Sequence, residues 1–345
     1  MPAAAMPLAA PLAASFGERL AERRRRLTAA LATAGRAALL ESLLAEVDAA
    51  LARLEDGSYG LCVACGDAVE VDRLAADPLL RFCLDHLSAA ERRAFEHDLD
   101  TAARIQRALV PPSDLAHAGW LLRFEYRPAG PVSGDFLVLP APVVTEPPTP
   151  RPLDLAFGDA AGKGVAGSLL VSQLHAIFRG LFAAGAPLAA LMSDANRIFC
   201  ESTPANAFAT AVAARLSPDG AAEIANAGHP PALLRAADGT VRRLDSGGLP
   251  LGLFARGEYA ARRLSLAAGE TLLLYTDGFS EATDPAGREH GVDRLAERFA
   301  TLGGAPPEES AAALVDHLAA FRAGGLARDV KAHDDLALLV VRRTA

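Results

Sequence analysis

Carboxylate side chains stand at the ends of strand-like segments at several places along the chain. They are Asp135 in VSGDFLVL, Asp159 in LDLAFGDAAGKG, Asp277 in TLLLYTDGFSEA, and Asp334 with Asp335 in HDDLALLVV. Taken singly, each is compatible with ordinary turn chemistry. If two antiparallel sheets pack face to face, however, these strand ends meet at one rim, where each close pair of charges costs roughly 3–4 kcal/mol at an effective dielectric of about 20. Unless the acids lie far apart or are protonated, cations must lie among them, and oxygen ligands without Cys or His indicate Mg²⁺ or Mn²⁺.

Three cysteines and a histidine form a second group with metal-binding chemistry, in the stretch YGLCVACGDAVEVDRLAADPLLRFCLDHL. They are arranged as two pairs, Cys62-x2-Cys65 and Cys83-x2-His86, with seventeen residues between the pairs. Thiolate and imidazole are ligands that tetrahedral zinc prefers, and this spacing is typical of a zinc ribbon. We therefore predict one structural Zn²⁺ held by these four residues.

Helical patterns dominate the N-terminal part of the chain. Apolar residues at steps of three and four predict a helical hairpin over 16–56, ahead of the cysteine segment at 57–87. A capping-box pattern then opens a connecting helix over 88–112, which ends at two prolines. Residues 1–15 are interpreted as a disordered tail rather than an export signal, because they lack a basic leader and contain three prolines.

The pattern of apolar residues changes after the two prolines, and residues 113–345 are predicted to form a separate domain. Short β-like segments alternate there with turn residues, as expected for antiparallel sheets. Longer segments with helical periodicity interrupt them at 165–184, 187–201, 291–301 and 307–323. The strand ends that carry the acids belong to this part of the chain.

Composition limits the classes of protein to consider. The 345 residues are 51% hydrophobic, enough for a large core and an accessory region. The net charge of −8 argues against nucleic acid as the main partner, because a phosphate backbone is bound by clustered Lys and Arg. Apolar runs are broken too often to predict a membrane span. Four cysteines without a disulfide framework suit a reducing cytoplasm.

Six ordered segments carry a family resemblance: ARIQRALVP, VSGDF, GDAAGKG, NAGHPP, YTDGFSEA and DDLALLVV. Over about 240 residues they closely resemble the SpoIIE/RsbU-type serine phosphatases, a bacterial branch of the metal-dependent (type 2C) protein phosphatases. The resemblance implies an α+β fold, an α-β-β-α four-layer sandwich with two Mn²⁺ or Mg²⁺ between the sheets. It also implies hydrolysis of phosphoserine or phosphothreonine on a regulatory partner protein, such as an anti-sigma-factor antagonist.

The motifs of this family imply roles for individual residues. The implied metal contacts are Asp135, Asp159, Ala160 through its carbonyl, Asp277, Asp334 and Asp335. Of the last two, Asp334 is favoured as the ligand and Asp335 as its neighbour. His229 either positions substrate, protonates the leaving serine oxygen or stabilises a turn, and Lys163 either contacts phosphate or is a solvated loop residue. The family often has a second Asp shortly after GDF, where this chain reads FLVL.

The cysteine segment resembles the DksA/TraR-type zinc finger family in its lead-in LEDGSYGLCVACG and in the Pro before the second pair. His86 stands where that family usually has a fourth cysteine. The family is associated with reaching into RNA polymerase through an acid-tipped coiled coil, but the turn LATAGRA here carries no acid. A zinc-stapled structural or sensory module is therefore the favoured interpretation.

The combined prediction is a cytoplasmic signalling phosphatase, with the N-terminal and connecting helices as candidates for a homodimer interface. We hypothesise that the connecting helix transmits changes of packing to the metal site, or that zinc loss or thiol oxidation is the signal. The alternative is a regulator without turnover that binds a phosphoprotein or RNA polymerase.

Overall fold

The computed structural model describes residues 10–34, 38–86, 89–140, 151–162, 164–204, 206–324 and 334–344. The chain forms two compact units, Met1–Asp98 and Leu99–Ala345. The division falls inside the helix α4 (Ala89–Leu109), which lies within the connecting helix predicted over 88–112. The reason is that the end of this helix packs on the second unit, where Gln106 is buried and Val110 contacts the core between the sheets.

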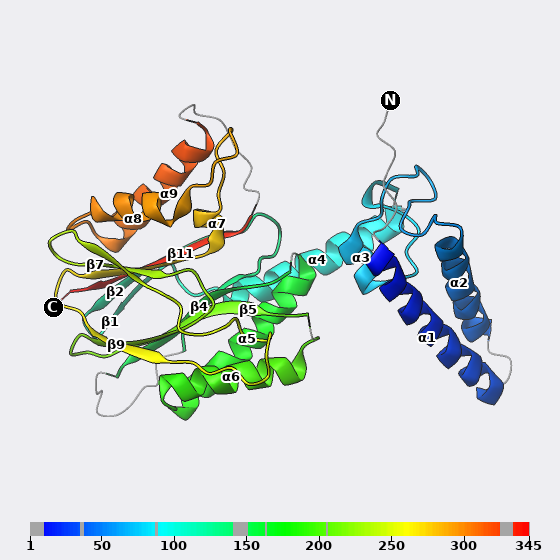
Figure 1. Ribbon diagram of the computed structural model, residues 1–345, viewed down its shortest axis with the longest axis horizontal. Coiled ribbons are helices and arrows are strands. Elements are labelled where there is room, and N and C mark those ends of the chain that lie inside the picture. The colour runs from blue at the N-terminus through cyan, green and yellow to red at the C-terminus, as the bar shows by residue number, and fades with distance from the viewer. Residues whose placement is uncertain are drawn as a thin grey trace. The chain divides into compact units, whose positions relative to one another are not determined.

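The first unit is built on two helices, α1 (Ala10–Ala34) and α2 (Ala38–Glu55), which lie side by side (Figure 1). Helix α1 begins at Ala10, so residues 10–15 are helical and the tail predicted for 1–15 is wrong for that part. Residues 1–9 lie outside the described part of the chain. Leu20 and Val47 are fully buried between the helices, as the three-and-four periodicity requires.

The cysteine segment shares its core with this hairpin. It contains a short helix, α3 (Val71–Ala76), and a 3₁₀ turn, η1 (Leu84–His86). The rings of Phe16 and Tyr59 lie 5.8 Å apart, and the Arg19 guanidinium donates to the carbonyl of Ala75 at 3.0 Å. The hairpin and the cysteine segment are therefore one structural unit.

Two antiparallel sheets form the second unit, and the mixed α+β class is confirmed. The six-stranded sheet has the order β1 (Asp114–His117), β2 (Trp120–Arg127), β11 (Leu336–Arg343), β10 (Thr271–Tyr275), β7 (Ala232–Arg235) and β8 (Val241–Leu244). The five-stranded sheet has the order β3 (Asp135–Val138), β4 (Leu153–Ala160), β5 (Ala209–Leu216), β6 (Ala221–Ala227) and β9 (Ala261–Ser265).

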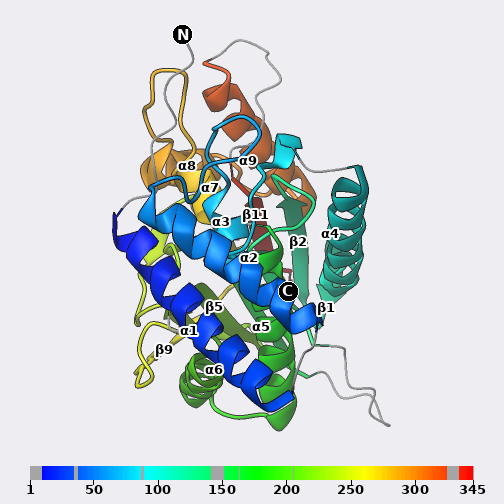
Figure 2. The same ribbon diagram turned by 90° about the vertical axis from the view of Figure 1, so that its right-hand side faces the viewer.

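Side-chain alternation explains how these sheets are covered. Along β5, Val212 and Leu216 point into the core that the two sheets share, whereas Ala209, Ala211 and Ala213 face α5 (Val165–Ala184) and α6 (Leu188–Ser202). Helices α8 (Gly291–Ala300) and α9 (Pro307–Arg322) pack on the six-stranded sheet through residues such as Phe299 and Leu314. The two helix pairs lie on opposite sides of the paired sheets (Figures 1 and 2).

Helix α5 is long and apolar enough to cross a membrane by length and composition alone, which the sequence had not predicted for any segment. Its Leu174, His175 and Phe178 are buried, and Phe178 packs on Phe136 of β3 with ring centroids 6.4 Å apart. In this fold α5 is a core helix of the second unit.

Candidate active site

The acidic strand ends meet at one end of the two sheets. Asp135 opens β3 and is the direct cross-strand partner of Asp159 in β4. Asp277 follows β10 and begins the short helix α7 (Asp277–Ser280), while Asp334 and Asp335 precede β11. Because β10 and β11 are antiparallel neighbours, the end of one lies beside the start of the other.

The charges of these residues act on one another. Burial raises the pKa of the Asp135 carboxyl well above its usual range, and the neighbouring carboxylates of Asp159, Asp335 and Asp277 raise it further. Burial, with the negative charges of Asp277, Asp334 and Asp335, raises the pKa of Asp159 to about 7. Desolvation and like-charge repulsion both penalise ionised carboxylates, so a cation among them would be strongly favoured.

Gly134 leaves the space in which Asp159 and Ala160 can approach the start of β3. A methyl group placed on Gly134 would lie 2.6 Å from Oδ1 of Asp159 and 2.6 Å from the carbonyl oxygen of Ala160. The Ala160 amide donates to the Gly134 carbonyl at 3.0 Å, which fixes this approach. The glycine of the SGD segment is thus needed for close packing of two oxygen atoms, the carboxylate of Asp159 and the carbonyl of Ala160.

Asp335 contacts the backbone rather than an open space between carboxylates. Its Oδ1 accepts a hydrogen bond from the Ala129 amide at 2.8 Å, and its Oδ2 accepts one from the Gly134 amide at 3.0 Å. Both oxygens therefore hold the loop that leads into Asp135. These bonds give Asp335 a role in shaping this loop, and its contact with a metal stays a prediction, with Asp334 as the favoured ligand of the pair.

Two buried side chains that were given no role from the sequence support the same loop. Thr276 donates through Oγ1 to Oδ2 of Asp135 at 2.9 Å. Gln106 of α4 donates to the Ser133 carbonyl at 2.6 Å and accepts from the Ser133 amide at 2.9 Å. Both residues occur in quoted motifs, YTDGFSEA and ARIQRALVP, but their partners are far away in the sequence and could not be read from it.

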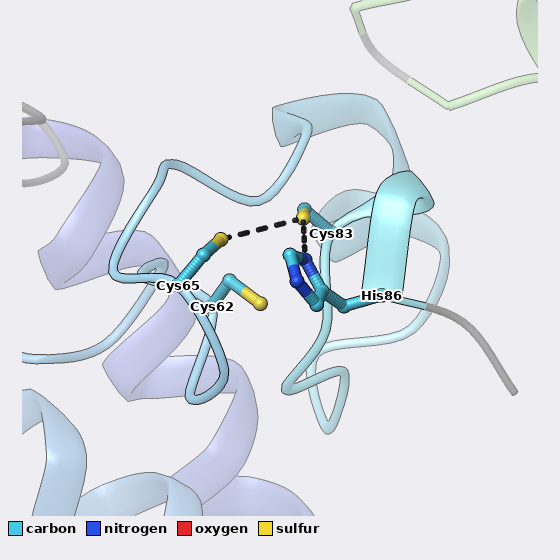
Figure 3. A group of neighbouring side chains, drawn as sticks. All are labelled: Cys62, Cys65, Cys83 and His86. Atoms are coloured by element: carbon cyan, nitrogen blue, oxygen red, sulfur yellow. Dashed lines mark hydrogen bonds between the residues drawn. The ribbon is translucent and has the colours of Figure 1, made fainter. Parts of the chain in front are cut away.

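Three cysteines and a histidine form a compact group in the first unit: Cys62, Cys65, Cys83 and His86 (Figure 3). Their four candidate ligand atoms all lie within 4.8 Å of one another. The Sγ atoms of Cys65 and Cys83 are 3.8 Å apart, and Nδ1 of His86 is 3.3 Å from Sγ of Cys83. Two thiolates at 2.3 Å from one tetrahedral Zn²⁺ would be separated by about 3.8 Å, so the spacing fits that ion.

Hydrogen bonds from the surrounding backbone stabilise the ionised thiolate form of Cys62. Burial of this side chain opposes ionisation, but hydrogen bonds from the backbone of Cys83, Ala64 and Cys65 favour the charged form, and the pKa falls to about 6. The first pair sits in a tight turn in which the Gly66 amide donates to the Cys62 carbonyl at 2.8 Å. Such a turn directs both sulfurs of a Cys-x2-Cys pair to one side.

Comparison with known proteins assigns the second unit to a protein family. Residues 149–344 match the family model of Stage II sporulation protein E (SpoIIE). The chain belongs to the SpoIIE family. Asp159, Asp277 and Asp334 lie within the matched range, whereas Asp135 lies just before it.

Several relatives of known name share this similarity. The chain is 30% identical over 130 residues to phosphoserine phosphatase RsbP of Bacillus subtilis, covering 36% of this chain and 32% of RsbP. It is 24% identical over 260 residues to phosphoserine phosphatase RsbU of the same organism, covering 73% of this chain and 72% of RsbU. It spans about a third of the length of RsbP and of protein IcfG from Synechocystis.

Two solved structures share the fold of the second unit. The SiaA-PP2C domain of Pseudomonas aeruginosa superposes with a TM-score of 0.61 at 24% identity, covering 74% of this chain and 99% of that domain. The RsbU and RsbW domains of Rv1364c from Mycobacterium tuberculosis superpose with a TM-score of 0.55 at 27% identity, covering 66% of this chain and 60% of that one.

The side chain of His229 lies next to Thr210, which is the cross-strand partner of Asp159. Its ring is buried edge-on against Phe157, and its Nδ1 lies 2.9 Å from Oγ1 of Thr210. Burial lowers the pKa of His229 to about 3, so the ring is neutral near pH 7. The role as acid stays a prediction that this burial does not favour. The Asn226 side chain accepts from the His229 amide and donates to the His229 carbonyl, which supports the turn-stabilising role. Lys163 lies outside the described residues.

Proposed function

We propose that this protein is a metal-dependent protein phosphatase that hydrolyses phosphoserine or phosphothreonine on a regulatory partner protein. The observation that carries the proposal is the meeting of buried, mutually repelling carboxylates at one end of the two sheets. Family membership and the named phosphatases RsbU and RsbP support it. We infer that the catalytic unit is an α-β-β-α four-layer sandwich.

The residues present fit a pair of Mn²⁺ or Mg²⁺ ions. Asp135 and Asp159 would hold the cations from the five-stranded sheet, and Asp277 and Asp334 would hold them from the six-stranded sheet. The carbonyl of Ala160 is a further oxygen within this group. When bound, two such ions lower the pKa of a water to make hydroxide and neutralise phosphoryl oxygens during in-line attack.

The chain itself contributes rigidity to this chemistry. Asp277 follows a strand whose five residues are all buried, and Asp159 is fixed in register opposite Asp135. A misplacement of about 1 Å can lower the rate about 10²-fold. The gain in rate from rigidly positioned carboxylates therefore offsets the free-energy cost of burying their charge. Gln106 ties α4 to the same site, which supports the hypothesis that the connecting helix transmits changes of packing to it.

The partner is proposed to be a phosphorylated anti-sigma-factor antagonist or a similar small regulator. This rests on the similarity to RsbU and RsbP and on the Mycobacterium tuberculosis structure, whose name pairs RsbU with RsbW domains. A cytoplasmic location and a homodimer through the N-terminal and connecting helices remain parts of this proposal.

The first unit is proposed to hold one structural Zn²⁺ through Cys62, Cys65, Cys83 and His86, in a DksA/TraR-type finger. The donor set, the 3.8 Å sulfur separation and the lowered pKa of Cys62 support this assignment. In this role the ion would fasten the finger to the helical hairpin, because Cys62 and Cys83 belong to the core that the two share.

Hydrolysis of an aryl phosphate and of a phosphoserine protein in the presence of Mn²⁺ tests the proposed activity. We expect turnover by the full-length protein and its loss in Asp277→Asn, with the fold retained. Asp316→Asn is the matched control, because Asp316 is an exposed acid on α9. Binding of a phosphoprotein without turnover by the unaltered protein would instead favour the non-catalytic regulator.

A further inference from the structure

Thr276 is a fully buried threonine at the N-cap position of α7, but its hydroxyl does not cap that helix. It is the residue before α7, where a threonine usually caps the helix by accepting a backbone N–H. Here it makes no side-chain cap hydrogen bond. Its Oγ1 points instead to Oδ2 of Asp135, 2.9 Å away. The hydroxyl therefore serves a residue 141 positions earlier in the chain.

The bond joins the two sheets at the site. Thr276 follows β10 of the six-stranded sheet, and Asp135 opens β3 of the five-stranded sheet. The hydroxyl also accepts a hydrogen bond from the Ala337 amide at 3.1 Å, and the Thr276 amide donates to the Ala337 carbonyl at 3.0 Å. Bonds to β11 thus fix the threonine, and the threonine in turn fixes the carboxylate.

We propose that Thr276 is a positioning residue, which orients the Asp135 carboxylate for the metal pair. This inference rests on the proposed function. The bond to Oδ2 restricts rotation of the Asp135 carboxylate, so that its oxygens keep one orientation at the site. The next residue, Asp277, would supply a ligand from the six-stranded sheet. The dipeptide Thr276-Asp277 would therefore position one carboxylate from each sheet, that of Asp135 and that of Asp277 itself.

Paired substitutions separate the hydroxyl from the size of the side chain. Thr276→Val keeps the shape and removes the hydroxyl, whereas Thr276→Ser keeps the hydroxyl and removes the methyl group. Partners that orient metal ligands typically change metal affinity or activity by about 10–100-fold when removed. We expect Thr276→Val to raise the dissociation constant for Mn²⁺, measured by calorimetry on the full-length protein, by that factor. Thr276→Ser should restore most of the affinity.

Thr271→Val is the matched control, because Thr271 is also a mostly buried threonine, at the opposite end of the same strand. It should leave Mn²⁺ affinity unchanged. A double substitution sharpens the test: in an Asp135→Asn background, Thr276→Val should have no further effect on Mn²⁺ binding.

The inference is overturned if Thr276→Val binds Mn²⁺ as the unaltered protein does, or if Thr276→Ser loses as much affinity as Thr276→Val. Either result would make Thr276 a packing residue only, while leaving the phosphatase proposal intact. If the unaltered protein itself shows no saturable Mn²⁺ binding, the proposed function fails and this inference falls with it.

Discussion

At the scale of single residues, the carboxylates at the rim are costly to ionise without a cation. Asp135 and Asp159 face one another across neighbouring strands, and both have raised pKa values because they are buried among like charges. In the folded, metal-free protein they therefore keep protons that the unfolded chain releases at a lower pH. Metal binding must displace these protons.

This arrangement predicts how stability depends on pH. Between about pH 4 and about pH 7 the Asp159 carboxyl binds more protons in the folded than in the unfolded state, so its contribution to the free energy of unfolding of the metal-free protein falls as pH rises, whereas His229, whose pKa is lowered by burial, contributes in the opposite direction. Urea unfolding at several pH values, followed by the fluorescence of Trp120, checks this, because Trp120 is the single tryptophan and is buried in β2. Asp159→Asn should lack this falling contribution when it is compared with the unaltered protein. Equal pH dependence of the two metal-free proteins would contradict the account.

The sequence indicated which acids belong to the site but not how each is used. An aspartate after a leucine-rich strand is visible as a local pattern, and so Asp277 could be singled out. The partners of Asp335 and Thr276 are 201 and 141 residues away, and only folding brings them together. His229 looked reactive by residue type, but its burial depends on the packing of the sheets.

At the scale of elements, the strand ends are close because small residues allow it. Gly134 packs against Asp159 and Ala160, and a methyl group on Gly278 would lie 2.0 Å from the carbonyl oxygen of Asp335. Glycine at these positions is a requirement of backbone approach at the site, since no φ value in the left-handed region is involved at either.

Substitution of Gly134 tests this requirement. Gly134→Ala should displace Asp159 or Ala160, lowering Mn²⁺ affinity at least 10-fold and destabilising the fold by about 1–3 kcal/mol. Gly130→Ala in the same loop is the control, because its added methyl group would meet its nearest neighbour at an ordinary 3.7 Å. Calorimetry and urea unfolding of both variants give the comparison, and equal behaviour of the two would refute the packing argument.

The strands that the sequence analysis did not predict are edge strands. The segments at β1, β8 and β9 lie at the margins of their sheets, and β8 and β9 read VRRL and ARRLS. Edge strands are exposed and often charged, so they lack the apolar run that marks a central strand. The central strands β4, β10 and β11 lie in strand-like segments that the sequence shows ahead of or after an acid, and the helices α5, α6, α8 and α9 were predicted nearly to their ends.

At the scale of the whole molecule, a unit with a Cys/His cluster and a unit of the SpoIIE family share one chain. In the first unit, Cys62 and Cys83 belong to the same core as Leu20 and Val47 of the hairpin. A core of this size is small, and small domains commonly depend on a structural metal for their stability.

Zinc removal is therefore expected to act on the first unit alone. A zinc-selective chelator should make residues 57–87 sensitive to protease, while the unfolding midpoint reported by Trp120 stays unchanged. His86→Ala should lower the zinc content measured by mass spectrometry, and His86→Cys, which restores a four-thiolate site, should retain one ion per chain. Full zinc content in His86→Ala would exclude His86 as a ligand.

The most direct measurement of the central claim is anomalous diffraction at the manganese edge from crystals of the full-length protein grown with Mn²⁺. The account predicts two peaks about 3.5–4 Å apart, among the carboxylates of Asp135, Asp159, Asp277 and Asp334. Peaks elsewhere, or no peak beside these residues at saturating Mn²⁺, would contradict it.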